Sequence, residues 1–134
     1  MRAKARLRLS DRKGQAAVEL ALILPVLVLL LLGMLQVGIV LEDYLQLQQA
    51  VEQGARAASL GAADASIQQT VDGAAPSLDP SALTVTVTPV ASERQSGTDV
   101  TVQGTYSVSI SIPLLSPLLG GGLQISSESV MRME

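Results

Sequence analysis

Residues 14–40 read GQAAVELALILPVLVLLLLGMLQVGIV, and this stretch decides the fold. Between Ala16 and Val40 the single charged side chain is Glu19. A helix needs about 20 apolar residues to cross the hydrocarbon core of a bilayer. At about 1.5 Å per residue, the segment from Ala16 to Val40 rises roughly 37 Å, enough to span a bilayer with some tilt. The stretch therefore predicts a transmembrane helix, in which Glu19 needs a partner because a carboxylate is costly in lipid.

Charge is segregated on the two sides of this stretch. Residues 1–14 carry six basic side chains and one acidic one, a net charge of +5, whereas residues 15–134 carry a net charge of −8. Basic flanks of a membrane span stay in the cytoplasm, so we expect a cytoplasmic N-terminus and an outer domain from about residue 41 onward. Because the basic run abuts the apolar stretch and the rest of the chain is acidic, nucleic-acid binding is disfavoured.

The composition excludes several kinds of site. The 134 residues include no Cys and no His, which rules out disulfides and the common zinc and thiolate centres. Without His, the Ser residues lack the usual base that activates a nucleophile. The glycines at 120–122 come without the Lys of a phosphate-binding loop, and the acidic residues lack the spacing of a calcium loop. We therefore expect a protein that is not an enzyme and holds no cofactor or metal.

A basic run followed by an apolar stretch also describes a secretory signal peptide. Signal peptides, however, have an apolar core of about 7–15 residues, and no small-x-small cleavage site follows Val40 closely. A permanent signal anchor accounts for the length and for the charge. It accounts for Glu19 if the carboxylate reaches back toward the cytoplasmic headgroups and Lys13.

A second interpretation of Glu19 comes from its spacing. Gly14 and Glu19 form the pattern G-x-x-x-x-E behind a short basic leader and at the entrance of an apolar helix, which resembles the processing site of type IV prepilins. The fuller run from Gly14 to Gly38, with Pro25 inside it, is similar to TadE-like minor pseudopilins of the tight adherence (Tad/Flp, type IVc) pilus system. The similarity continues in VEQGARAA at 51–58 and, more loosely, in the MRME of the last residues.

This resemblance implies that a prepilin peptidase cuts after Gly14, that Gln15 becomes the new N-terminus, and that Glu19 pairs with another subunit. Removal of residues 1–14 would delete the basic anchor. The free amine of a neighbouring subunit can then neutralise Glu19 at low dielectric, which also fixes the axial register. Leu20 stands where the major pilins of that system carry an aromatic residue, which favours a minor subunit.

Beyond the span, a helical stripe of apolar and small residues predicts that the helix continues. We expect one helix from about Gln15 to Leu60, ending near Gly61. The stripe comprises Leu41, Tyr44, Leu45, Gln48, Val51, Gly54, Ala55 and Ala58. Its small residues allow close approach of a helix or a sheet, either within the outer domain or in another subunit.

Residues 64–74 predict a short second helix. Asp64 is placed to act as its N-cap, and Ile67 and Val71 lie four residues apart on the edge expected to be buried. The following segment, AAPSLDPSA at 74–82, is rich in Pro and Ser and predicts a loop.

Three segments with a period of two then predict strands. They cover residues 83–88, 100–112 and 123–133, joined by a hairpin loop at 92–97 and by PLLSPLLGGG at 113–122. Gly104 is expected to form a bulge or a weak point in the second strand. The predicted fold class is therefore α+β, a three-stranded antiparallel meander laid on the outer half of the long helix.

The loop at 113–122 carries four leucines in a region expected to lie outside the membrane. A monomer would hide such an apolar patch. The loop either folds back over the sheet or contacts a membrane surface or another subunit, and the sequence leaves both open. The residues concerned are Leu114, Leu115, Leu118 and Leu119.

The predicted organisation is a leader at 1–14, a transmembrane half of the helix at 15–40 and an extracytoplasmic α+β domain at 41–134. The resemblance implies a minor pilin, processed after Gly14, that serves assembly or initiation of a tight-adherence pilus in adhesion or biofilm formation. Its partners would be the prepilin peptidase, other pilins and the inner-membrane assembly platform. Two alternatives remain open: a permanently signal-anchored envelope scaffold, and a pseudopilin of a secretion system.

Overall fold

The computed structural model describes residues 3–112, 117 and 120–134. They fall into two units that meet in the chain between Val37 and Gly38. Helix α1 (Ala3–Ser59) makes up the described part of the first unit and contributes its last turns to the second. The four leucines predicted to form an apolar loop, at positions 114, 115, 118 and 119, lie outside the described residues.

Helix α1 begins at Ala3 rather than near Gln15. The predicted start was wrong because residues 3–13 hold mainly Ala, Leu, Arg and Lys, which favour a helix, and contain no Gly or Pro. The predicted end is confirmed. Gly61 has a φ of +82° and donates its N–H to Ala58, while Ala62 donates to Ala57. These two bonds satisfy carbonyls that the end of a helix otherwise leaves unpaired, and glycine adopts the required positive φ without strain.

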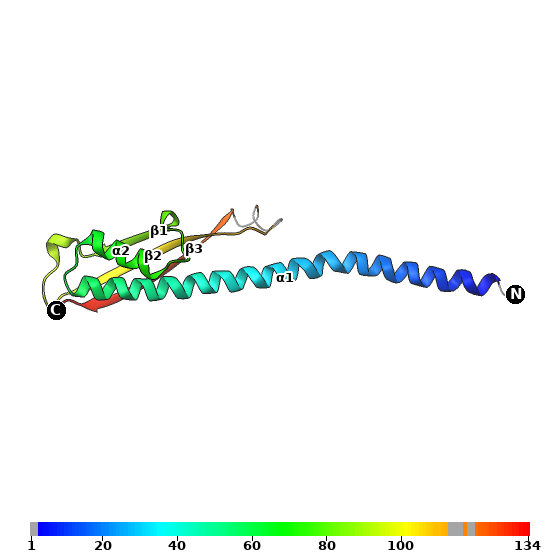
Figure 1. The fold of residues 1–134 in the computed structure, drawn as a ribbon, viewed down its shortest axis with the longest axis horizontal. Helices are drawn as coiled ribbons and strands as arrows, with labels where there is room; N and C mark the ends of the chain where they lie inside the picture. The colour runs from blue at the N-terminus through cyan, green and yellow to red at the C-terminus, as the bar shows by residue number, and fades with distance from the viewer. Residues whose placement is uncertain (1–2, 113–116, 118–119) are drawn as a thin grey trace. The chain divides into compact units, whose positions relative to one another are not determined.

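The second unit contains helix α2 (Asp64–Ala74) and a sheet of three strands, β1 (Leu83–Thr88), β2 (Asp99–Ser109) and β3 (Gly122–Arg132). The strands are antiparallel in the order β1-β2-β3. Figure 1 shows the last turns of α1 running alongside the sheet with α2 above them. The predicted α+β fold class, with a meander and one short extra helix, is confirmed.

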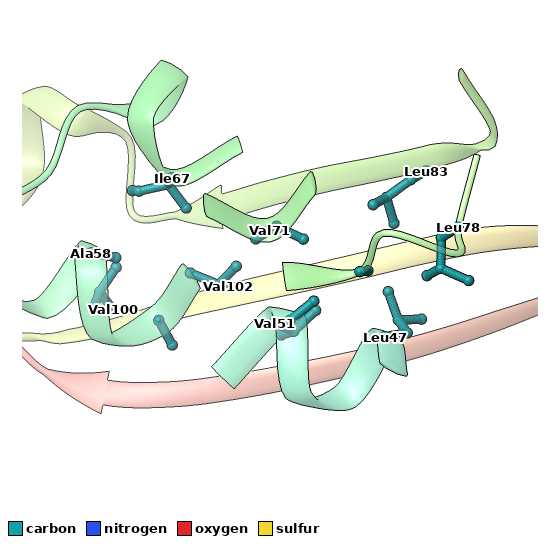
Figure 2. Packing of buried hydrophobic residues seen from close by; sticks show 12 residues of the cluster. Leu47, Val51, Ala58, Ile67, Val71, Leu78, Leu83, Val100 and Val102 are labelled. Carbon is teal, nitrogen blue, oxygen red and sulfur yellow. The ribbon is translucent and has the colours of Figure 1, made fainter. Parts of the chain in front are cut away.

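One face of the sheet and the two helices enclose the core. Even-numbered residues of β2 point into it, since Val100, Val102 and Val108 are buried while Gln103 and Ser107 are exposed. Tyr106 is half-buried beside the core and supplies its single aromatic ring among the described residues. Figure 2 shows how side chains from α1, α2, β1 and β2 meet. The cluster consists of Leu47, Ala50, Val51, Ala55, Ala58, Ile67, Val71, Ala75, Leu78, Leu83, Val100 and Val102.

The predicted buried stripe of α1 was correct in its second half and wrong in its first. Gly54, Ala55 and Ala58 are buried as expected. Leu47 is completely buried, whereas its neighbour Leu45 remains 50% exposed. The predicted stripe was wrong at Leu41, Tyr44, Leu45 and Gln48, which are exposed. The true stripe is rotated, because the sheet packs against the side of the helix that carries Leu47, Ala50 and Val51.

The predicted bulge at Gly104 was also wrong. Gly104 pairs in unbroken register with Val85 of β1 and Ser127 of β3. A Cβ at this position would lie 2.7 Å from Val51 Cγ2 and 2.9 Å from Leu47 Cδ1. The glycine is therefore needed because α1 approaches β2 closely at this point.

Asp64 is the first residue of α2, and its expected role as N-cap was wrong. The N-cap position is Ala63, which makes no side-chain capping bond. The Asp64 carboxylate instead forms an ion pair with the guanidinium of Arg94, which lies just after the short turn Ala91–Glu93 between β1 and β2. Ile67 and Val71 form the buried edge of α2 as predicted.

Candidate functional site

The residues predicted for processing and pairing lie on successive turns of α1. Gly14, Gln15 and Glu19 are all helical and exposed. Gly14 and Glu19 are separated by about 7.5 Å along the axis, from the rise of about 1.5 Å per residue. A Cβ added at Gly14 would meet nothing within 4 Å. Glu19 takes part in none of the ion pairs formed by the described residues, so its carboxylate is open to a partner outside this chain.

The apolar part of α1 that follows Glu19 is uncovered. The large apolar side chains from Val18 to Ile39 are each more than a third exposed. Among the described residues, α1 is the one helix long and apolar enough to cross a membrane, and none of its apolar window is buried by the chain itself. An apolar surface of this extent requires lipid or other apolar helices around it. The apolar surface of the first unit is therefore suited to contact with lipid or with other apolar helices.

Two polar side chains of α1 are half-buried within the second unit, and one of them bonds to the loop after α2. Gln46 donates from Nε2 to Ser77 Oγ at 3.1 Å. Asp43, one turn earlier, is half-buried, and burial together with the nearby Glu42 carboxylate raises the pKa of Asp43. In the same loop, hydrogen bonds from the hydroxyl and the N–H of Ser81 lower the pKa of Asp79.

Sequence reasoning missed two contacts that tie distant parts of the second unit together. Arg94 is 5% exposed at its side chain and donates from Nε to the carbonyl of Pro89 at 2.9 Å, besides its ion pair with Asp64. Glu134 donates its backbone N–H to the carbonyl of Ser59 at the end of α1, at 3.1 Å. Neither contact follows a local pattern, so neither leaves a signal in the sequence.

Comparison with known proteins gives a family match along helix α1. Residues 14–56 match the family model of TadE-like proteins, which confirms the resemblance drawn from Gly14, Glu19 and the apolar run. The match begins at Gly14 and ends within the part of α1 that packs on the sheet. No curated protein and no solved structure matches the chain.

Proposed function

We propose that this chain is a minor pilin or pseudopilin of a tight-adherence type IV pilus, processed after Gly14 and active in pilus assembly or initiation. The observation that carries the proposal is Glu19, an exposed acid at the start of an uncovered apolar helix, five residues after Gly14 and inside the TadE-like match. The role is structural: the chain binds other subunits and the inner-membrane platform rather than transforming a substrate.

The proposed sequence of events follows from charge. The basic leader holds the N-terminus in the cytoplasm while α1 spans the inner membrane and the second unit lies outside. Cleavage after Gly14 removes the anchor and leaves a free amine on Gln15. In the filament that amine neutralises Glu19 of a neighbour, and a misaligned neighbour leaves a carboxylate unpaired in an apolar setting.

To test the proposal, the full chain is produced together with an active or an inactivated prepilin peptidase. Mass spectrometry then identifies the N-terminal peptide of the chain in each case. A start at Gln15 that requires the active enzyme supports the proposal. Gly14→Leu is expected to block cleavage. Gly33→Leu is the matched control, because Gly33 lies in the same helix, also has open space around its Cα and is remote from the cut.

If the chain still begins at Met1 or Arg2 when the peptidase is demonstrably active, the proposal is overturned. The chain would then be a permanently anchored scaffold. If cleavage occurs, Glu19→Gln is expected to leave cleavage intact and to reduce recovery of the chain in sheared pili. Normal recovery of this variant would show that Glu19 does not pair the subunits.

A further inference from the structure

Strands β2 and β3 continue together beyond the border that β1 sets in the described sheet. Strand β1 pairs with β2 from Thr101 to Tyr106, whereas β3 pairs with β2 as far as Ser109. Residues 107–109 and 122–124 therefore form a two-stranded projection, which we call the β2–β3 arm. Figure 1 shows the orange start of β3 within this arm.

The arm points toward the apolar segment of α1. Side chains of Leu47 and Val51 lie against Gly104, in the middle of β2. Farther along the helix, Ser59 accepts a hydrogen bond from Glu134, which follows β3. The end of β3 therefore lies at the end of α1, and its start lies nearer to the apolar segment of the same helix.

The length of the arm brings it to the level at which that segment ends. Gly104 lies level with about residue 49 of α1, midway between its two contacts on the helix. From Gly104 to Ser109 the strand advances about 17 Å, at about 3.4 Å per residue. This equals about 11 residues of helix, or fewer if the strands are inclined to it, and points to about residues 38–41. On the same side of α1, Val40 and Asp43 are half-buried, so the helix is covered as far as this level.

The chain that forms the arm is uncharged. Residues 100–127 contain no Asp, Glu, Lys or Arg. The charges that flank this stretch are Asp99 and Glu128, and Asp99 pairs with Arg132 at the far end of the sheet. Leu123, within the arm, is exposed. The part of the hairpin that lies nearest the apolar segment thus combines an exposed leucine with the absence of charge.

Exposed apolar side chains also occur on another side of the second unit at this level. Leu41, Tyr44 and Leu45 of α1 are all exposed. Leu45 comes two residues before the buried Leu47, which places it on nearly the opposite side of the helix. A single protein partner would cover one of these sides, whereas the surface of a bilayer meets both.

We propose that the β2–β3 arm contacts the headgroup region of the bilayer that α1 spans, beside the point where the helix emerges. The headgroup region extends roughly 5–7 Å beyond the hydrocarbon core. Glu42 is the first charge after the apolar segment, so the core ends near Leu41 and the arm ends within the headgroup region. Tyr44 lies at the level where tyrosines are enriched in membrane proteins. The second unit then touches the membrane at two places, which limits its rocking on α1.

This inference rests on the membrane span included in the proposed function, but not on cleavage after Gly14 or on entry into a pilus. The test uses the full chain in vesicles of phosphatidylethanolamine and phosphatidylglycerol, with a fluorophore on one introduced cysteine, because the sequence has no Cys. Gln124→Cys is the test position and Val130→Cys the matched control. Both residues are exposed on the outer face of β3, about 20 Å apart.

Lipids that carry a spin label near the headgroup are expected to quench the fluorophore at position 124 at least threefold more than at position 130. Ser107→Cys, whose Cα lies opposite Gln124, should be quenched like Gln124→Cys, which guards against a local effect of one substitution. Equal quenching at 124 and 130 would overturn the contact.

Two further outcomes have distinct meanings. A fluorophore at position 124 that escapes the spin-labelled lipids, and is shielded only when the chain is crowded in the vesicles, would show that another copy covers the arm. The lipid contact would then be refuted. Alkaline washing tests the span itself. A chain removed by the wash refutes the span and the arm contact together, whereas a retained chain with equal quenching refutes the arm contact alone.

Discussion

Gly104 of β2 and Val51 of α1 meet where a side chain on Gly104 would not fit: its Cβ would lie 2.7 Å from Val51 Cγ2. Gly54 of α1 stands in the same relation to Val71 of α2, with 2.5 Å between the hypothetical Cβ and Val71 Cγ2. The sheet, α1 and α2 are the three layers of the second unit, and they approach each other most closely at these two glycines. Each is a point where the backbone of one element lies against a side chain of the next.

Gly104→Ala is expected to destabilise the second unit by about 1–3 kcal/mol, because the added methyl group must displace Val51 and Leu47. Thermal unfolding of the full chain in detergent, followed by tyrosine fluorescence, measures the change. Gly73→Ala is the control: nothing lies within 4 Å of its Cβ position in α2, so this change should be neutral or mildly stabilising. Equal effects of the two substitutions would contradict the packing described here.

Leu47→Ala should cost about 2–5 kcal/mol, because it leaves a cavity under a completely buried side chain. Leu45→Ala, two residues earlier and half exposed, should change the free energy of unfolding by about 0.5 kcal/mol or less. Chemical denaturation of both variants in the same detergent makes the comparison. A larger effect at Leu45 would instead support the buried side of α1 that was predicted from the sequence.

That stripe illustrates what the sequence can and cannot predict. The long helix, its end at Gly61, the second helix and the three strands follow from composition, glycine chemistry and period. The buried side of α1 does not, because leucines occur on both sides of it and Asp43 and Gln46, both half-buried, stand beside the true stripe. Only contact with the sheet selects Leu47 over Leu45. The residues predicted for processing, by contrast, form a local pattern, and the structure adds only their exposure.

Asp64→Asn is expected to destabilise the second unit by about 1–2 kcal/mol. Arg94 would keep a nearly buried charge with one partner fewer, but the carboxylate it loses is 57% exposed and partly screened by water. Unfolding of the variant at low and high salt tests this. Asp72→Asn in the same helix is the control, since Asp72 takes part in no ion pair among the described residues. An unchanged midpoint for Asp64→Asn would show that the pair contributes nothing.

Asp43 and Asp79 should affect stability with opposite signs as pH changes. The raised pKa of Asp43 means that its contribution becomes less favourable as pH rises from the ordinary carboxyl value through the raised one. Asp43→Asn should therefore stabilise the unit near neutral pH, by about 0.5 kcal/mol or less because the group still contacts water, and not at acid pH. A gain that persists at acid pH would point to another cause.

Asp79 stabilises the fold in its charged form, because its folded pKa is lowered by Ser81. Its contribution is complete above the ordinary carboxyl pKa and is lost as pH falls through the lowered value. Asp79→Ala should thus reduce the unfolding temperature near neutral pH and have little effect in strong acid. Melting curves recorded from neutral to strongly acid pH measure this difference. A reduction of the unfolding temperature that is the same at every pH would contradict the prediction.

The hydrogen bond between Ser59 and Glu134 sets an order of events during biogenesis. The end of α1 is made early, but the residue that closes it lies after the last strand. Strand β2 is likewise flanked on one side by a strand that emerges later. The side of the core that Met131 and Met133 pack against therefore stays uncovered until the last strand has been made.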